Sequence, residues 1–399
     1  MINVNKLFCI IILLISTLCI GKIIANDPLK DAIQVAQKVK ATNGEVVSCD
    51  PSLFNDSISI PLSFFCENFE VVKLESSDEA DVVPAPAIIS DNYILVESAA
   101  RRPFKLFDRK TGKFITDIGE YGVGPDKYGR IYHYQLDEEN DRIYVLPWIS
   151  KQILVYNLKG ELQPAIPLRL ASPKGTFKVN FADKKVAVVI LPFGELQAMA
   201  WEQTFEGKII KWIAPGHLSI PPEFEYEVST THAVDALDLF IFSTTPKIDT
   251  LYHYNMLENK LVPQFTFDFK EGDVPTHFFS QTKDYFIGET VVPKKENDTL
   301  VTEEPVNRFF IIDKASLKGS YFFVVNDFLG DMRVEWPVYN MSRGYYILNI
   351  APEDLREKLE ETLTENNEMS AEMREKMETL KNSITEKDNS YIIYGKLKI

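Results

Sequence analysis

The residues best suited to chemistry are a histidine and two nearby carboxylates, His232, Asp235 and Asp238. If they line one end of a channel, the imidazole and the carboxylates could act as acid and base groups or bind a cation. The alternative is ordinary packing, because the segment leads into a run typical of a buried strand. These three residues are therefore weak catalytic candidates.

The other histidines do not form a metal-binding pattern. None of the five histidines has H-x-x-x-H spacing to another, and none lies in an HExxH motif. His133 and His253 each stand between two tyrosines, which is typical of alternation along a strand. The sequence therefore predicts no metal site, and it indicates no cofactor.

A glycine-rich run over residues 119–125 could be mistaken for a phosphate loop. A nucleotide-binding loop needs a helix directly after its glycines, so that backbone amides point at the phosphate. Here Pro125 is followed by a β-like run instead of a helix. We expect a tight connection with glycines at positive φ and with Tyr128 packed beneath it.

Four residues near predicted connections between strands are candidates for ligand binding: Arg101, Arg102, Tyr144 and Trp148. Exposed aromatic side chains beside arginine suit the recognition of carbohydrate or peptide. Ordinary core packing is the alternative. The expected partner is therefore an unknown protein or carbohydrate.

Two cysteines, Cys49 and Cys66, lie beyond the N-terminal apolar segment. In an oxidising compartment they predict a disulfide, worth about 3 kcal/mol on the chain-entropy model. Two buried free thiols are the alternative. Neither cysteine is expected to be a nucleophile, because no histidine or basic residue adjoins it in the sequence.

The first 25 residues predict an export signal. Lys6 supplies a positive charge, and the apolar run over residues 7–20 is too short to span a bilayer comfortably. Cleavage after Ala25 would give a mature chain that starts near Asn26, whereas acylation of Cys19 would give a bacterial lipoprotein. Both alternatives place the protein in the periplasm or at the outer membrane or cell surface, with membrane contact only through such an anchor.

Charge excludes one class of partner. The formal net charge is −15, and no basic stripe is visible, so the sequence argues against nucleic-acid binding. An aromatic content of 12% and short strands punctuated by proline favour an all-β domain.

A short phrase recurs along the chain: a β-rich run, an aromatic or aliphatic residue, Asp or Asn, and then usually Gly. The copies, mostly about fifty residues apart, are Phe104–Gly112, Ile153–Gly160, Ala198–Gly207, Leu251–Asn259, Phe309–Gly319 and Tyr391–Ile399. Six such copies predict an all-β, six-bladed β-propeller. We expect the ring to close by pairing of the strand at residues 70–74 with the C-terminal strand at residues 391–398.

Two helical segments are predicted outside the repeats. Residues 28–41 read as a short amphipathic helix, and residues 352–384 as a helical hairpin inserted in the last blade, with Ser370 capping its second helix. The predicted domains are a signal peptide (1–25), the N-terminal helix with the segment leading into the first strand (26–66), and the propeller (67–399).

The Leu and Met stripe of this hairpin has two interpretations. It packs against the propeller, or it is exposed and docks a partner through Leu355, Leu359 and Met373.

The run over residues 108–128, with its Gly-x-Gly-Pro-x-x-Tyr phrase, resembles the six-bladed β-propeller proteins of gut Bacteroidetes. Those proteins are usually exported or lipid-anchored and are related to NHL-type propellers. Residues 60–76 and 387–399 resemble the first and the closing strands of that family, and the similarity is thin between residues 190 and 310. The resemblance implies the fold and export, but it implies no particular reaction and no catalytic residues.

These patterns favour an exported, non-catalytic binding propeller that recognises its ligand at the channel mouth. The alternative is an enzyme of glycan or ester chemistry, a lyase or hydrolase, with its site at the same mouth. An enzyme requires at least two titratable groups within hydrogen-bond reach of one pocket.

Overall fold

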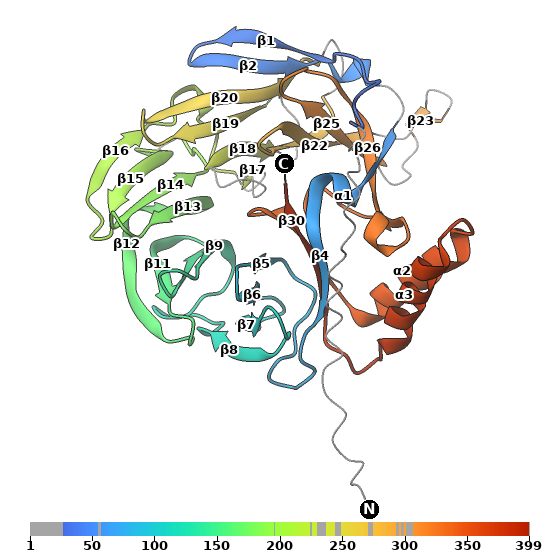
Figure 1. Ribbon diagram of the computed structural model, residues 1–399. Coiled ribbons are helices and arrows are strands. Elements are labelled where there is room, and N and C mark those ends of the chain that lie inside the picture. The colour runs from blue at the N-terminus through green and yellow to red at the C-terminus, as the bar shows by residue number, and fades with distance from the viewer. Residues whose placement is uncertain are drawn as a thin grey trace, which may run out of the picture.

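Six small β-sheets form a ring around a central axis, so the chain folds as a six-bladed β-propeller, as the repeats predict (Figure 1). The computed structural model describes residues 27–54, 57–194, 196–223, 226–229, 237–243, 249–269, 274–292, 295–296, 299–300 and 306–398. No helix among these residues is long and apolar enough to cross a membrane.

Blades 1 to 3 are four-stranded antiparallel sheets that follow one another along the chain. Blade 1 contains β5 (Ala87–Ile89), β6 (Tyr93–Val96), β7 (Phe104–Asp108) and β8 (Phe114–Ile118). Blade 2 contains β9 (Ile131–Asp137), β10 (Arg142–Pro147), β11 (Ser150–Tyr156) and β12 (Leu162–Ser172). Blade 3 contains β13 (Gly175–Asn180), β14 (Lys185–Ile190), β15 (Ala200–Thr204) and β16 (Ile209–Ile213). Their middle strands are rich in Val, Ile and Leu because both faces pack against neighbouring blades.

Blades 4 to 6 carry additions. Blade 4 contains β17 (Tyr226–Ser229), β18 (Asp238–Ser243), β19 (Thr250–Asn255) and β20 (Lys260–Phe267). Blade 5 contains β21 (Thr276–Gln281), β22 (Tyr285–Val292), β25 (Val306–Asp313) and β26 (Gly319–Asn326), with β27 (Met332–Val334) beside β26 and the small pair β23 (Lys295–Glu296) and β24 (Thr299–Leu300) between β22 and β25. Blade 6 contains β28 (Met341–Ser342), β29 (Tyr345–Ile350), β30 (Tyr391–Leu397) and β4 (Cys66–Lys73).

The recurring phrase is the turn between the third and fourth strands of a blade. The Asp or Asn side chain accepts a hydrogen bond from the backbone three residues later, as in Asp108 from Thr111 (2.8 Å) and Asp313 from Ser316 (2.6 Å). The third or fourth residue after this Asp or Asn position then takes a left-handed conformation, in which glycine costs least. That position is occupied by Gly112, Gly160, Gly207, Asn259 and Leu317. In the fifth copy, Phe309–Gly319, the left-handed residue is therefore Leu317 and not Gly319.

The ring closes as the sequence predicts. Strand β4, from the N-terminal part of the chain, pairs antiparallel with the C-terminal strand β30, from Tyr391 opposite Lys73 to Leu397 opposite Cys66. Through this pairing, a strand from the start of the domain becomes the fourth strand of the last blade. Blade 6 is therefore complete, and the ring of blades is closed.

The predicted helix over residues 28–41 is wrong. Only a turn forms near Leu29, and the chain continues as a hairpin of β1 (Ala36–Ala41) and β2 (Gly44–Cys49). Strand β2 adds in parallel to β20, the outer strand of blade 4. The apolar stripe was too weak to hold a helix, and the free backbone groups of the blade edge favour a strand instead.

The chain then continues along the outside of the ring. The 3₁₀ turn η1 (Pro51–Leu53) is followed by β3 (Ile58–Pro61), which adds in parallel to β26 of blade 5. The short helix α1 (Leu62–Phe65) then leads into β4. The N-terminal segment thus contacts blades 4, 5 and 6 in turn (Figure 1).

The predicted disulfide is absent, because both cysteines are buried free thiols. Cys49 ends β2 and packs with blade 4, whereas Cys66 begins β4 and packs in the cluster shared by blades 5 and 6. Burial raises the pKa of the Cys66 thiol to about 12 and also raises the pKa of Cys49. Both thiols are therefore protonated at neutral pH and act as small apolar side chains.

The helical hairpin forms as the sequence predicts, with α2 (Pro352–Glu365) and α3 (Ala371–Ser383). The Ser370 hydroxyl caps α3 by accepting a hydrogen bond from the Met373 backbone (3.2 Å). Leu355 and Leu359 are fully buried in the cluster that blades 5 and 6 share, and Met373 is partly buried against it. The interpretation with a packed stripe is therefore correct, and the exposed docking stripe is not present.

Ring closure should be sensitive to one glycine. Gly112 has φ +67°, and a Cβ at this position would overlap the carbonyl oxygen of Lys73, the last residue of β4. Gly344 has φ +82° but open space around its Cβ position, so Gly344→Ala isolates the cost of the left-handed conformation, about 1 kcal/mol. We expect Gly112→Ala to cost about 3 kcal/mol or more.

Thermal melts of both variants test this expectation. A Gly112→Ala melting temperature equal to that of Gly344→Ala would show that the close approach to β4 is not important for stability.

Candidate functional site

One end of the ring carries most of the longer connections. In antiparallel blades, the connections between blades and those between the second and third strands of each blade lie at the same end. We call this end the top face. It includes the glycine-rich loop before β9, the turn between β10 and β11, the connection before β28, and the helical hairpin between β29 and β30.

Three of the four tryptophans are exposed, although tryptophan is usually largely buried. Trp148 is 40% exposed, Trp212 46% and Trp336 48%, whereas Trp201 lies in the core. Trp148 and Trp336 are on connections of the top face, and Trp212 is on the outer strand β16 of blade 3. Exposed large aromatic side chains on one face indicate a recognition surface.

Trp148 lines a cavity of about 400 Å³ between the glycine-rich loop and the turn that joins β10 to β11. We call it the Trp148 pocket. The residues around it are Gly122, Val123, Gly124, Pro125, Lys127, Gly129, Arg130, Pro147, Trp148, Ile149, Ser150, Lys151, Gln152 and Leu154. Val123 and Ile149 are also exposed, so the rim is apolar as well as aromatic.

The shape of this pocket follows from tight packing beneath the glycine-rich loop. Tyr128 is buried, accepts a hydrogen bond from the Phe104 backbone (3.0 Å) and donates one to the Ile118 carbonyl. Gly119 has φ +68°, and a Cβ there would lie 2.6 Å from the Tyr156 ring. These contacts confirm the expected structural role of Gly119 and of Tyr128.

The same region is fixed from the other side. The Tyr156 hydroxyl donates to the Asp126 carbonyl (3.1 Å), and the Gln152 amide donates to the Pro125 carbonyl (2.7 Å). Burial raises the pKa of Tyr156 to about 12, so its hydroxyl stays a donor at neutral pH. The Trp148 backbone N–H donates to the Arg130 carbonyl (2.8 Å). The two walls of the pocket are therefore hydrogen-bonded to each other.

The lining is cationic in a protein of net charge −15. Three basic residues and no acidic residue line the pocket. Lys127 is 2.5 Å from Glu120 of the same loop, whereas Arg130 and Lys151 form no ion pair with any residue that the structure describes. Asp126 lies in the loop but not in the lining. The arrangement favours a ligand with a negative charge and an apolar face.

Inward of the pocket, a polar strip crosses the innermost strands. The Arg130 guanidinium lies over the Tyr132 ring (5.5 Å), and the Tyr132 hydroxyl is 3.4 Å from the Glu227 carboxylate of blade 4. Lys174, which precedes β13, donates to the same carboxylate (2.6 Å). The strip joins blades 2, 3 and 4 and places the Trp148 pocket beside the channel mouth.

The channel itself is crossed by Arg343 from the turn between β28 and β29. Its guanidinium lies 2.9 Å from His133 Nε2 and donates to the Tyr134 carbonyl, both on β9 of blade 2. His133 also packs edge-on against Phe177 (4.8 Å). His133 is therefore a structural strand residue, in agreement with the sequence interpretation.

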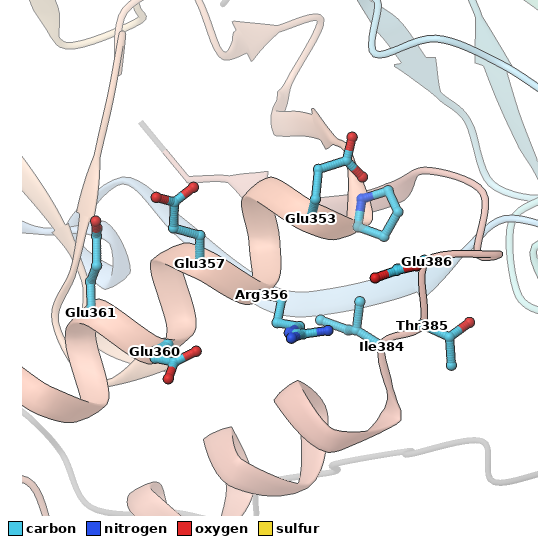
Figure 2. Close-up of a pocket in the computed structure, with 9 residues that line it drawn as sticks. Glu353, Arg356, Glu357, Glu360, Glu361, Ile384, Thr385 and Glu386 are labelled. Atoms are coloured by element: carbon cyan, nitrogen blue, oxygen red, sulfur yellow. The ribbon is translucent and has the colours of Figure 1, made fainter.

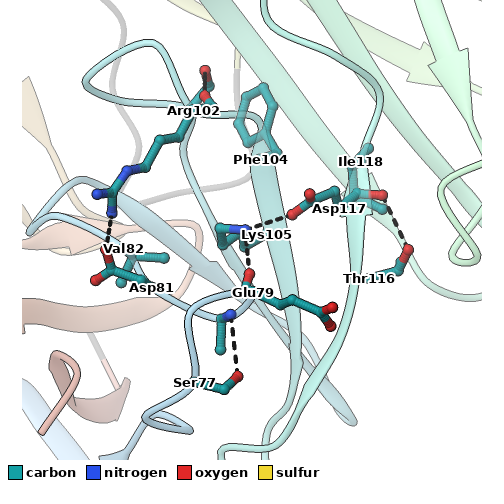
Figure 3. Close-up of polar contacts among 12 residues, drawn as sticks. Ser77, Glu79, Asp81, Val82, Arg102, Phe104, Lys105, Thr116, Asp117 and Ile118 are labelled. Carbon is teal, nitrogen blue, oxygen red and sulfur yellow. Dashed lines mark hydrogen bonds and ion pairs between the residues drawn. The ribbon is translucent and has the colours of Figure 1, made fainter.

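Of the four residues predicted to bind a ligand, only Trp148 lines this pocket. Tyr144 is buried in the core between blades 2 and 3, so it is not accessible to a ligand. Arg101 and Arg102 lie in the turn between β6 and β7, and Arg102 is 2.6 Å from Asp81 (Figure 3). The structure therefore separates the arginines from the tryptophan.

Figure 3 shows the polar contacts beneath this turn. The buried Lys105 ammonium contacts the Asp117 carboxylate (2.7 Å) and donates to the Glu79 carbonyl (2.5 Å). These bonds join β7, β8 and the segment before β5, and they hold the first blade together.

Of the three catalytic candidates, only Asp238 lies among the described residues. His232 and Asp235 lie outside those residues. Asp238 is fully buried, 2.8 Å from His253 Nδ1, and it accepts a hydrogen bond from the Gln281 amide (2.8 Å). Among the described residues, no hydroxyl or thiol is hydrogen-bonded to His253. Asp238 therefore joins blade 4 to blade 5.

The network continues to Lys314, whose ammonium donates to the Gln281 side chain (2.8 Å) and to the Thr282 carbonyl (2.6 Å). Burial lowers the pKa of Lys314 to about 8. Lys314 occupies the same repeat position as Arg109, which bonds Tyr394 of the preceding blade. Both cations follow the turn Asp and help to join neighbouring blades.

A second cavity of about 400 Å³ lies between α2 and residues 384–386 (Figure 2). Its lining includes Glu353, Glu357, Glu360, Glu361 and Glu386, with Arg356 among them. No group of His, Cys, Asp or Glu within the described ranges could hold a metal ion. We interpret this groove as a solvated acidic face of the hairpin.

Sequence reasoning missed Trp336 and Tyr339, which are both exposed on the connection before β28. The sequence contains a signal for this connection, because Trp336 lies next to a proline, Pro337, just as Trp148 lies next to Pro147. Proline beside an aromatic residue marks a connection or a strand edge.

Removing the Asp238 carboxylate should destabilise the ring strongly. Asp238→Ala leaves His253 and Gln281 without their buried partner, and we expect a cost of about 3 kcal/mol. The control in the same blade is Glu258→Ala, which removes an exposed pair with Lys260 (3.4 Å) and should change stability by less than about 0.5 kcal/mol. Denaturation curves of both variants measure the difference, and equal curves would contradict the structural role of Asp238.

Glu97, which follows β6, gives a prediction for pH dependence. Burial raises its pKa from 4.5 to about 7, against a hydrogen bond with Tyr134 that opposes the shift. Between these values the folded chain holds a proton that the unfolded chain releases. This contribution to stability is therefore full below 4.5 and is lost as the pH rises through 7.

Melting temperatures at about pH 5 and about pH 8 test this expectation. The wild type should lose more stability between them than Glu97→Gln, which does not titrate. An equal loss in both proteins would show that Glu97 does not carry the raised pKa.

Comparison with known protein families matches residues 44–396 to the family described as "Domain of unknown function (DUF4934)". No curated protein matches the chain. Among solved structures, a "Putative exported protein" from Bacteroides fragilis is similar, with a TM-score of 0.56, 14% identity, and 87% of this chain and 99% of that chain covered. A member of the DUF4221 family from Bacteroides vulgatus has a TM-score of 0.41 and 11% identity, with 84% and 97% covered. At these identities the likeness concerns the fold alone.

Proposed function

This chain belongs to the DUF4934 family, and we propose that it is an exported binding protein that captures a small anionic ligand at the Trp148 pocket. The observation that carries the proposal is a pocket with an exposed tryptophan, three basic residues and no acidic residue on an acidic protein. Arg130 and Lys151 supply charge that no described residue neutralises, and the indole supplies an apolar surface.

Binding is favoured over catalysis by the chemistry of the lining. The pocket contains no histidine, carboxylate, cysteine or tyrosine, and its one hydroxyl belongs to Ser150. Lysine and arginine side chains alone do not supply the pair of carboxyl groups, or the nucleophile and base, that glycan or ester cleavage requires. The Ser150 hydroxyl donates to the Gln152 carbonyl (2.6 Å) and so serves the turn.

Export rests on the N-terminal segment and on the solved relative. Residues 1–25 have the charge and apolar length of a signal peptide, and Cys19 is the alternative site of lipid attachment. The B. fragilis protein of similar fold is described as an exported protein. These features support the proposal that the protein acts outside the cytoplasm, and the resemblance of residues 108–128 supports the proposal that it is an NHL-type propeller.

The proposal predicts a salt-sensitive interaction that depends on Trp148. The mature chain should bind an oligogalacturonate or a sulfated disaccharide, and binding should weaken as salt rises. Trp148→Ala and Arg130→Ala should each weaken it about tenfold, or 1.4 kcal/mol. Isothermal titration calorimetry measures these changes.

The matched control is Trp212→Ala, which removes an equally exposed tryptophan from the outer strand of blade 3. It should leave the affinity unchanged. If no anionic probe binds, or if Trp148→Ala binds as the wild type does, the pocket is not the binding site.

A further inference from the structure

A second exposed aromatic site lies on the connection between β27 and β28, away from the Trp148 pocket. Trp336 is 48% and Tyr339 50% exposed, with ring centroids 6.1 Å apart and planes at 65°. The two rings therefore form two walls of an open corner. We call this feature the aromatic corner.

The aromatic corner is supported from below. Phe278 stacks on Tyr339 (5.3 Å, 24°), and Phe309 packs edge-on against Trp336 (6.2 Å, 84°). The Tyr339 hydroxyl donates to the Glu289 carboxylate (2.6 Å), which is buried on β22. Burial raises the pKa of Glu289. The orientation of the Tyr339 ring is thus fixed by packing on one face and by a hydrogen bond at its tip.

Trp336 is held in an unfavourable backbone conformation. Its φ is +52°, a region that bulky residues seldom adopt. The carbonyl of Trp336 accepts hydrogen bonds from the backbones of Tyr339 (3.1 Å) and Asn340 (3.3 Å), so the turn fixes this conformation. A glycine would adopt this backbone conformation at lower cost, so an exposed tryptophan here lowers stability, which points to a functional use.

The helical hairpin contacts the chain on both sides of β27. Lys376 of α3 donates to the Phe328 carbonyl (2.9 Å), and Asn366 donates to the Gly330 carbonyl (3.1 Å). Lys358 of α2 pairs with Glu335, the neighbour of Trp336 (2.6 Å). The hairpin therefore fixes the turn before β27 and contacts the connection that carries the corner through the Lys358–Glu335 pair, which gives it a role beyond filling the core.

The chemistry of the corner fits a sugar ring. Among the described residues, the exposed apolar surface here is limited to two aromatic side chains, and their neighbours Glu335 and Asn340 are polar. This surface is too small for the core of a protein interface. A pyranose has one apolar face of C–H groups and a polar edge of hydroxyls, which matches aromatic walls with a polar rim. We propose that the aromatic corner binds a pyranose ring of a neutral saccharide. This site does not depend on the Trp148 pocket.

The deciding variant is Trp336→Gly in the full mature chain. Glycine accepts the left-handed conformation, so the melting temperature should stay within about 2 °C while binding falls at least about tenfold. The probes are maltohexaose, cellohexaose, mannohexaose and xylohexaose, measured by isothermal titration calorimetry. Trp212→Ala and Trp148→Ala should both bind as the wild type does.

Two further variants test the positioning role of Glu289. Glu289→Ala should weaken saccharide binding by freeing the Tyr339 ring, whereas Glu289→Gln keeps an acceptor and should bind as the wild type does.

If Trp336→Gly fails to fold, Tyr339→Ala decides instead. The proposal is overturned if no neutral hexasaccharide binds the wild type, or if the deciding variant binds with unchanged affinity. Loss of anionic binding alone would affect only the Trp148 pocket.

Discussion

The antiparallel pairing of β4 with β30 is the contact on which the rest of the molecule depends. A blade alone cannot bury both faces of its sheet, so each one is stable only between two neighbours, and the ring must therefore be complete. The pairing also brings the Lys73 backbone of blade 6 against Gly112 of blade 1, so these two blades pack directly on each other. Polar contacts strengthen such junctions between blades, as in the Arg109 and Asp238 networks. Within blade 1, the contacts of Lys105 join neighbouring strands.

Closure leaves the connections of the top face free to vary. The two exposed tryptophans there are presented differently. The glycine-rich loop brings Trp148 beside basic residues, whereas the helical hairpin braces the strained turn that carries Trp336. One scaffold thus supports two surfaces of different chemistry, in keeping with the general separation of fold from function.

Local signals in the sequence were sufficient to predict the propeller, its closing strands and the helical hairpin: the Asp or Asn turn, the alternating apolar runs and the Ser370 cap. Residues 28–41 became strands because the edge of blade 4, which is more than 200 residues away in sequence, supplies their partners. Cys49 and Cys66 do not pair because the fold buries them in different core clusters. Trp148 was found from its neighbours in sequence. The Trp336 site was missed because its support comes from Glu289, Phe278 and the hairpin, which only the fold brings together.

The route of the N-terminal segment along blades 4, 5 and 6 has a consequence for biogenesis. Strands β2, β3 and β4 pair with residues 265–267, 322–325 and 391–397, all of which are synthesised later. The start of the domain therefore cannot dock until nearly the whole chain has emerged, and contacts of such long range make folding slow. A chain that cannot fold until its last strand is available stays unfolded for longer. This property suits passage through a narrow translocation channel before the domain folds on the far side.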